Sequence, residues 1–285
     1  MNAAAFSSSA SEIPSIDPAA IRSHVEMLHA LADGVDGILT LTRICARTEK
    51  VDGTERFAIG DVNNMVAAIE GWSRQPYNLY APWSVFRTSL ERGSKGKEAD
   101  VVVCLGLVGD LDADKGLPGN PLPLPAPYIV ETSEGNAQPV FPFSRPLPPQ
   151  EAKPIAVALS DAIGADTRTQ DVCGLWRIPG TLNWATKKKL DRGRSELPQQ
   201  VRIKQAWTGE LVEPEAIWEK VSGFARQKKS KADSKGNHQG FNDLKASLKK
   251  LIASPACPGE DESETAAQCP PAGPYRGRHI ARRSH

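Results

Sequence analysis

The sequence has 285 residues, of which 40% are apolar and 24% charged, and its formal net charge at pH 7 is +1. This length suits one large domain or two modest ones, and the apolar fraction is sufficient for a globular core. A net charge so close to zero excludes a protein that attracts nucleic acid through its overall charge, so any nucleic-acid surface must come from local basic clusters.

Hydrophobic periodicity and turn residues predict a chain that mixes helices and strands. The first helix is well marked, because Asp17 and Pro18 favour a helix start and apolar residues then recur at helical spacing. Residues 101–108 form a nearly continuous apolar run, which is typical of a strand buried on both faces. In chain order we expect a helix at 18–32, strands at 37–48 and 55–60, a helix at 61–74 capped by Asp61, strands at 101–108, 128–135 and 139–147, a helix at 150–165, a strand at 200–207 and a helix from 214.

Composition divides the chain into one domain with flanking segments. Residues 15–224 carry the apolar periodicity and form the expected domain. Residues 225–240 are charged and lack this periodicity, which predicts a basic linker, and residues 241–253 predict a short amphipathic helix. The ends, residues 1–14 and 254–285, lack a packing pattern and are expected to be disordered.

The five cysteines are scattered, with no Cys-x-x-Cys pair and no histidine at ligand spacing, which argues against structural zinc. Their odd number, together with the lack of an N-terminal apolar segment and cleavage site, favours a reducing cytoplasm. The longest apolar run is too short to span a bilayer. We therefore expect a cytoplasmic protein without membrane association.

Two aspartates follow the apolar run at residues 101–108. Alternate side chains of an extended strand share a face, so Asp110 and Asp112 are expected on one face with Cα atoms about 6.6 Å apart. Such a pair suits a hard divalent cation, Mg²⁺ or Mn²⁺, which prefers oxygen ligands. The same residues are also compatible with a solvated acidic turn. A calcium-binding loop is disfavoured, because the twelfth position from Asp110 holds Pro121 instead of an acidic residue.

Three segments occur in order along the chain: LVGDLDAD at residues 107–114, TSEGNAQ at 132–138, and ADTRTQDVCGLWRIPGTLNW at 165–184. Together they resemble the three motifs of the archaeo-eukaryotic primase superfamily, in particular its plasmid, phage and prophage primase-polymerases. Residues 177–183 match the Arg-x-Pro-Gly-Thr-x-Asn sequence of this branch at every fixed position. The segment at residues 78–82 also resembles the one that precedes the catalytic strand, and the resemblance covers roughly residues 20–210.

The resemblance implies an α+β fold, a two-layer primase-polymerase core with an RRM-like sheet that is mixed and largely antiparallel. It implies that Asp110 and Asp112 bind the metals, Mg²⁺ or Mn²⁺. The third carboxylate is either Asp166 or Asp171, and Asp166 is favoured because it follows the small residue Ala165 at the end of a helix-to-strand connection.

The resemblance also implies a nucleotide site. The residues that would line the phosphates of the incoming nucleotide are Ser133, Gly135, Asn136, Gln138 and Arg177. Backbone N–H groups of a glycine-containing turn form an anion-binding nest, and an arginine offers a planar fork of donors. Many family members have histidine where Gln138 stands, and glutamine donates only a neutral hydrogen bond. This departure leaves the strength of catalysis open.

Basic and aromatic residues follow the third segment. The basic run comprises Lys187, Lys188 and Lys189, and two arginines lie shortly after it. Its place beside the proposed site favours contact with a template backbone, although such runs are often solvated surface alone. Trp184 is a candidate for stacking a template base, while core packing is expected for at least one of Trp176 and Trp184.

These features predict a DNA primase or primase-polymerase domain of a mobile-element replication protein. The expected reaction is template-directed nucleotidyl transfer by a two-metal mechanism. The expected partners are a single-stranded DNA template, nucleoside triphosphates and a replicative helicase acting in trans, because no Walker A sequence is present in the chain. The alternative is a catalytically weak, primase-like DNA-binding module that tethers or recruits a helicase. A metal-dependent nuclease would use the same carboxylates.

Overall fold

The structure, a computed structural model, describes residues 13–113, 116 and 119–232. Contacts divide the chain into a unit of residues 1–234 and a second unit of residues 235–285, which lies wholly outside the described residues. The expected helix at 241–253, the expected disordered tail at 254–285 and most of the expected disordered N-terminus therefore also lie outside them. None of the described helices combines the length and the apolar character that crossing a membrane requires.

The first half of the described chain contains two helices and four strands, and the helices and the first two strands lie close to the ranges expected. They are α1 Pro18–Leu31, β1 Ile38–Cys45, β2 Val51–Ala58, α2 Val62–Trp72, β3 Tyr77–Ala81 and β4 Ser84–Phe86. Asp17 caps α1 by accepting a hydrogen bond from the Ala20 N–H at 3.0 Å. Asp61 stands at the cap of α2, but its carboxylate accepts from the Asn64 side chain and from no backbone N–H.

The second half contributes the longest strands and the remaining helices. They are β5 Val101–Val108, β6 Leu111–Asp112, β7 Tyr128–Ser133, β8 Asn136–Leu147, α3 Pro149–Ile163, the 3-10 helix η3 Thr167–Gln170, β9 Trp176–Arg177, β10 Leu182–Asn183, α4 Lys187–Leu190, β11 Gln199–Gln200, β12 Arg202–Gln205 and α5 Pro214–Ala232. β8 contains prolines and is extended, as expected, because the fixed φ of proline disfavours a helix.

The strands form one ten-stranded sheet in the order β12-β7-β8-β5-β4-β1-β3-β9, with β2 paired to β1 and β6 paired to β8. All ladders between the described strands of this sheet are antiparallel, and a single parallel bridge joins Phe143 to Val212. The expected α+β class with a large antiparallel sheet is therefore confirmed.

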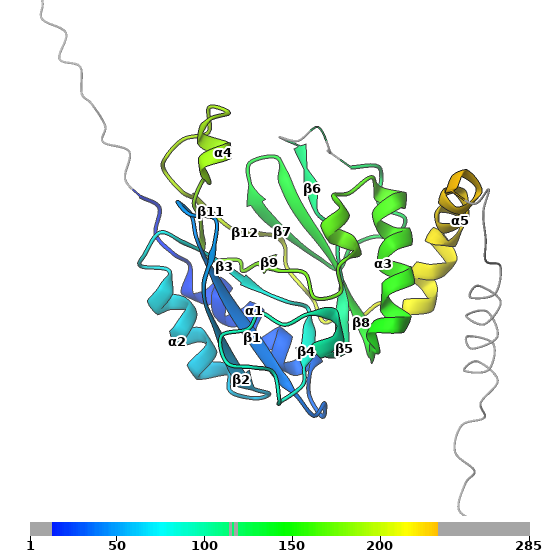
Figure 1. The fold of residues 1–285 in the computed structure, drawn as a ribbon, viewed down its shortest axis with the longest axis horizontal. Coiled ribbons are helices and arrows are strands. Elements are labelled where there is room, and N and C mark those ends of the chain that lie inside the picture. The colour runs from blue at the N-terminus through cyan, green and yellow to red at the C-terminus, as the bar shows by residue number, and fades with distance from the viewer. Residues whose placement is uncertain (1–12, 114–115, 117–118, 233–285) are drawn as a thin grey trace, which may run out of the picture. The chain divides into compact units, whose positions relative to one another are not determined.

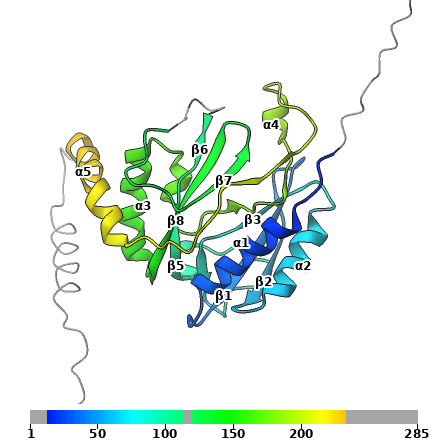
Figure 2. The same ribbon diagram turned by 180° about the vertical axis from the view of Figure 1, so that it is seen from behind.

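In one half of the sheet α1 and α2 pack on one face, and in the other half α3 and α5 pack on the opposite face (Figures 1 and 2). α1 and α2 contribute to a core with residues such as Leu39, Leu79 and Val140. α3 and α5 contribute to a second core with residues such as Leu107 and Phe141. Val140 and Phe141 are neighbours in β8 and enter different cores, because successive strand residues point to opposite faces. The expected layering of helices on a sheet is thus found in each half.

Two segments differ from the expectations. β5 is buried from Cys104 onward, but Val102 is exposed, so the strand is covered on both faces only along its second part. α5 extends to Ala232, into the segment expected to be a linker from residue 225. Packing of Ile217 and Val221 in the second core anchors this helix, and the following residues, QKKSKA, favour a helix without needing an apolar face.

A buried histidine makes the stability of this core depend on pH. His24 of α1 is 2% exposed, its Nδ1 lies 3.2 Å from the Tyr128 hydroxyl oxygen, and burial lowers the pKa of His24 to about 3. Since the unfolded chain binds the proton below about pH 6.5 and the folded chain does not, stability is lost as the pH falls from 6.5 towards 3. From pH 7 to pH 5, His24 is expected to reduce the free energy of unfolding by about 2 kcal/mol.

The check is urea unfolding of the protein and of His24→Leu at both pH values. The variant should lose about 2 kcal/mol less between pH 7 and pH 5, whatever its absolute stability. An identical loss in both proteins would contradict the prediction, because the other titrating groups are common to the two.

One end of the sheet collects the two aspartates, the β7–β8 turn and the basic run. β1, β5 and β7 run in one direction while β3 and β8 run in the other, since neighbouring strands pair antiparallel. The ends of β5 and β7 and the start of β8 therefore lie together, and α4 and β6 stand at the same end (Figure 1).

Candidate active site

The two aspartates lie where β5 gives way to β6. Asp112 belongs to β6, whereas Asp110 lies in the break between the strands, so the expected single strand through both residues is interrupted. Asp112 pairs directly with Asn136, and the Asp110 carboxylate accepts a hydrogen bond from Gln138 Nε2 at 3.3 Å. Asn136 and Gln138 are alternate residues of β8 and share a face. Both aspartates therefore face the same side of the sheet, as expected.

The β7–β8 hairpin is fixed to the aspartates through Asn136. Its Nδ2 donates to Ser133 Oγ at 2.8 Å, and its Oδ1 accepts from the Ala113 N–H at 2.8 Å. Gly135 in the turn has φ of +76°, which side-chain-bearing residues rarely adopt. The expected nucleotide-binding residues of the turn are thus placed beside Asp112, with Ser133 and Asn136 themselves buried.

Arg177 lies on the far side of Gln138 from the turn. The Gln138 Oε1 accepts from the Arg177 N–H at 3.2 Å, so this amide connects Arg177 to Asp110. Arg177 pairs with Tyr80 across β9 and β3, and its guanidinium carbon lies 4.6 Å from the centroid of the Tyr80 ring. Burial lowers the pKa of Arg177, and its Nη1 is buried with no hydrogen-bond partner among the described residues. The site thus holds a cation whose hydrogen-bonding capacity is not filled.

The two candidates for a third carboxylate are placed differently. The Asp166 N–H donates to the Asp110 carbonyl oxygen at 3.1 Å, while its carboxylate accepts from the Arg168 N–H at 3.0 Å and caps η3. Asp171 is exposed, and its carboxylate accepts from the Cys173 N–H and thiol, both at 3.1 Å. The backbone of Asp166 is therefore tied to Asp110, whereas the Asp171 carboxylate is engaged elsewhere.

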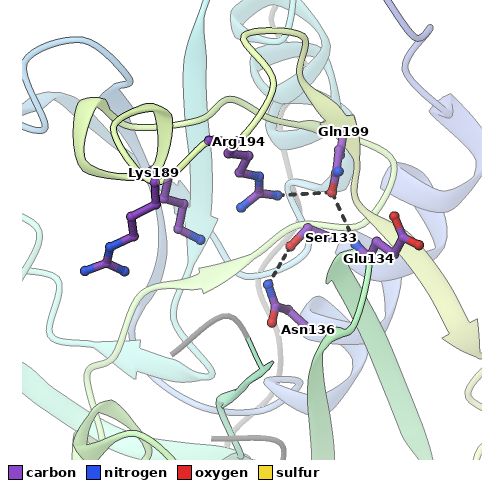
Figure 3. Close-up of a pocket in the computed structure, with 8 residues that line it drawn as sticks. Ser133, Glu134, Asn136, Lys189, Arg194 and Gln199 are labelled. Atoms are coloured by element: carbon purple, nitrogen blue, oxygen red, sulfur yellow. Dashed lines mark hydrogen bonds between the residues drawn. The ribbon is translucent and has the colours of Figure 1, made fainter. Parts of the chain in front are cut away.

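A basic pocket of about 360 Å³ opens beside the hairpin. Its walls are Ser133, Glu134 and Asn136 of the hairpin, Gln199, and the loop residues Lys189, Arg192, Gly193 and Arg194. Figure 3 shows Lys189 and Arg194 across the pocket from Ser133 and Asn136. Gln199 accepts from the Arg194 guanidinium at 3.1 Å and from the Glu134 N–H at 3.2 Å, which fixes the loop against the hairpin. Three basic residues against one acidic residue make this pocket suitable for phosphates.

The remaining expected residues separate into pocket and surface. Lys189 lines the basic pocket, but Lys187 and Lys188 are exposed, and Lys188 lies 4.0 Å from Glu49. Trp176 is a core residue, while Trp184 is half-buried and lines a different pocket. The expectation that at least one of the two tryptophans packs in the core is therefore confirmed.

No family model matches the sequence, and no curated protein matches it. Three solved structures are similar to this chain. The archaeo-eukaryotic primase domain of the cyanophage S-2L primase-polymerase aligns with a TM-score of 0.50 and 16% identity, over 73% of this chain and 100% of that one. Primase RepB′ aligns at a TM-score of 0.49 and 15% identity, over 82% of this chain and 69% of that one. The catalytic domain of primase RepB′ in complex with initiator DNA aligns with a TM-score of 0.47 and 15% identity, over 75% of this chain and 99% of that one.

The chain has an archaeo-eukaryotic primase-type fold. The S-2L domain is covered over its whole length, and the match takes in 73% of this chain. The expected resemblance is confirmed at the level of the fold.

Three residues that help to build the site of this primase-type fold were missed in the sequence. Thr169 Oγ1 accepts from the Asp110 N–H at 2.9 Å, and Tyr80 lies under Arg177. Gln199 joins the basic loop to the hairpin. Tyr80 belongs to the segment at residues 78–82 that resembles the one before the catalytic strand, and its alternation with Asn78 predicts that both lie on one strand face. Nothing in the local sequence distinguishes Gln199 from the polar residues around it.

Replacing Gln138 with methionine is expected to destabilise the primase-type fold by about 1–3 kcal/mol. Methionine keeps the length of the side chain but removes both hydrogen bonds, so the half-buried Arg177 N–H loses its acceptor. Urea unfolding without metal measures the change in the free energy of unfolding. Gln75→Met, at an exposed position, is the matched control and should stay within about 0.5 kcal/mol of the parent. Equal effects of the two substitutions would mean that the two hydrogen bonds of the Gln138 side chain contribute nothing to the free energy of unfolding.

Proposed function

We propose that the protein is a primase or primase-polymerase domain of a mobile-element replication protein, plasmid, phage or prophage, which catalyses metal-dependent, template-directed nucleotidyl transfer. The observation that supports this most strongly concerns the β7–β8 hairpin. Asp110 and Asp112 contact β8 on one side of the sheet, and the basic pocket opens at the turn of the same hairpin. A single-stranded DNA template and nucleoside triphosphates are the proposed partners, a replicative helicase acts in trans, and the proposed location is the cytoplasm.

The donor set fits a divalent cation such as Mg²⁺ or Mn²⁺. Among the described residues no group of three or more histidine, cysteine, aspartate or glutamate side chains surrounds a common point. Mg²⁺ is nevertheless commonly held by one or two carboxylates together with substrate phosphates, and it keeps several waters. Asp110 and Asp112 would supply the carboxylates and the nucleotide the rest. When bound, the cation would polarise the phosphates, neutralise the leaving pyrophosphate and activate the attacking hydroxyl.

The side chains around this pair would position the nucleotide. Lys189, Arg192 and Arg194 would bind the triphosphate in the basic pocket, where charge-assisted hydrogen bonds are strong. The backbone of the Gly135 turn would donate to the phosphates, while Asn136 keeps that turn next to Asp112. This arrangement would place the α-phosphate near the aspartates, where the acceptor hydroxyl attacks and pyrophosphate leaves.

Arg177 would bind a phosphate oxygen of the nucleotide or template. Its guanidinium is held over Tyr80 and its Nη1 has no described acceptor, so a phosphate would fill the vacant hydrogen bond. Gln138 would hold Arg177 next to Asp110, because its side chain is hydrogen-bonded to both.

Of the two candidates for a third carboxylate, Asp166 is the one that would support the site, because its backbone is bonded to Asp110. It would act from outside the direct ligands of the cation, by helping to hold Asp110 in place. Asp166→Asn is expected to raise the Mn²⁺ concentration for half-maximal primer synthesis by about 10-fold. Asp171→Asn, which makes the same charge change, should shift it less than about twofold. Manganese titrations of primer synthesis measure both values, and the reverse order would assign the role to Asp171.

The decisive experiment incubates the protein with single-stranded templates and labelled nucleoside triphosphates in Mn²⁺ or Mg²⁺, and then sizes the products. We expect oligonucleotide products that depend on template and disappear with chelator. Template cleavage in place of synthesis would overturn the proposal in favour of a nuclease.

A catalytically weak DNA-binding module is the second candidate. The specific observation in its favour is that the Asp166 carboxylate caps η3 while Gln138 stands at the end of the nucleotide turn, where the family commonly has histidine. DNA binding that survives chelation, with no nucleotide incorporation under any metal, would favour this candidate.

A further inference from the structure

A second pocket, of about 570 Å³, shares no lining residue with the basic pocket. Its apolar wall includes Ile16, Pro76, Leu182 and Trp184, and its charged wall consists of Arg47 and Arg74. No acidic residue is found among the described residues that line it. The volume lies within the range of about 300–1,000 Å³ that is usual for small-ligand sites.

The sheet topology explains why this pocket lies near the proposed active site. Arg47 follows the end of β1, and Arg74 precedes the start of β3, while β1 runs parallel to β5 and antiparallel to β3. Both arginines therefore stand at the end of the sheet where β5 delivers Asp110. They are exposed, and neither forms an ion pair with a described carboxylate.

Strand β3 connects the pocket to Arg177. Asn78 donates to the Trp184 carbonyl oxygen at 3.1 Å and accepts from the Trp184 N–H at 2.9 Å, which holds the tryptophan on β3. Tyr80, under the Arg177 guanidinium, is the next residue of β3 on the same face. Cα atoms two residues apart on a strand are about 6.6 Å apart, close to the spacing of neighbouring nucleotides in an extended single strand.

The indole N–H of Trp184 donates no hydrogen bond to the described residues. Its nitrogen, Nε1, is buried. A buried donor without a partner in a pocket wall is explained by a ligand or water that completes it. An indole ring also offers the flat surface on which bases of any sequence stack.

We infer that this pocket is a second binding site for single-stranded DNA, in which Trp184 stacks one template base while Arg47 and Arg74 bind the adjoining phosphates. The apolar wall accepts the base and the arginines complement the phosphates. The DNA then runs along β3 from the pocket to Arg177. The choice of DNA as the ligand rests on the proposed function. Other occupants, such as a peptide or residues 1–12 of this chain, are outcomes of the test.

Fluorescence anisotropy of a labelled thymidine oligonucleotide of about 20 nucleotides, with chelator and without nucleotide, tests the inference. The full chain is compared with Arg47→Gln/Arg74→Gln and with the matched control Arg92→Gln/Lys95→Gln. The control removes two exposed cations from the loop before β5, at the opposite end of that strand from Asp110. We expect the pocket variant to bind about tenfold more weakly and to lose about 1.4 from the slope of log affinity against log salt, since each phosphate contact contributes about 0.7. The control should change affinity less than twofold.

Equal losses in the two double variants would overturn the inference, because they would reflect net charge alone. Photocross-linking of the unmodified chain to an oligonucleotide that carries iodinated uracil gives an independent measurement. A cross-link in the tryptic peptide of residues 178–187, which contains Trp184, supports the inference. Cross-links confined to other segments assign the pocket to another occupant and overturn it. Because neither measurement requires catalysis, DNA binding at the pocket without primer synthesis would refute the proposed function and leave this inference standing.

Discussion

Replacing Asp112 with asparagine is expected to lower the rate of primer synthesis by about 1,000-fold or more. The substitution keeps the size of the side chain and removes the formal charge that the proposed site needs for a divalent cation. Asp112 is 7% exposed and lies opposite Asn136, so few other ligands can replace it. Single-turnover primer extension with excess enzyme measures the rate of the chemical step without product release.

The fold should survive this substitution. Asparagine has nearly the same size and shape as aspartate, so the packing around position 112 is kept and the melting temperature in chelator should change little. Addition of Mn²⁺ and nucleotide should raise the melting temperature of the parent chain but not of Asp112→Asn, because only a state that binds ligand gains stability.

The matched control for Asp112→Asn is Asp33→Asn. It removes one exposed carboxylate just before β1, at the opposite end of the sheet, and should leave primer synthesis within about twofold of the parent. Synthesis at the parental rate by Asp112→Asn would exclude the carboxylate pair from the chemistry.

Replacing Gly180 with alanine is expected to lower the free energy of unfolding by about 3–5 kcal/mol. Gly180 has φ of +86°, and a Cβ there would press against the Asp17 carbonyl oxygen and lie 2.8 Å from Ile21 Cγ1. The same glycine donates to Val201 O and accepts from the Asp17 N–H, both at 2.8 Å, so its backbone cannot move away without breaking these bonds. The loss corresponds to a melting temperature about 10 °C lower for a chain of this size.

Gly209→Ala separates the two contributions to this loss. Gly209 has a similar φ of +93°, but an added Cβ there meets no atom within 4 Å. Its substitution should therefore cost only the backbone strain, about 1–2 kcal/mol. Urea unfolding measures both variants. If Gly180→Ala costs no more than Gly209→Ala, close packing against α1 does not explain the glycine of the Arg-x-Pro-Gly-Thr-x-Asn sequence.

Features that depend on neighbouring residues in the chain were predictable. The cap at Asp17, the strands around a polar turn and the common face of the two aspartates all follow from local spacing. The break between β5 and β6 was not predicted. Both strands pair with β8 in one register, Val108 with Val140 and Asp112 with Asn136, and only residues 109 and 110 interrupt the ladder.

Features that depend on contacts between distant segments were not predictable from spacing. Gln199 reaches the Glu134 N–H across more than sixty residues, and Lys189 faces a hairpin turn about fifty residues before it. The position of Trp184 against β3 depends on Asn78 in the same way. Motif resemblance supplied the candidate residues, but packing decides which of the lysines enters a pocket and which stays in solvent.

The backbone hydrogen bond between Asp17 and Gly180 has a consequence during synthesis on the ribosome. About 160 residues separate its two ends, and a ribosome that adds about 5–20 residues per second needs about 10–30 s to make them. The start of α1 therefore leaves the ribosome that long before its partner loop does. The first helix of the chain is thus among the last to reach its final anchorage, and a nascent chain arrested before residue 180 presents that helix start to chaperones and proteases.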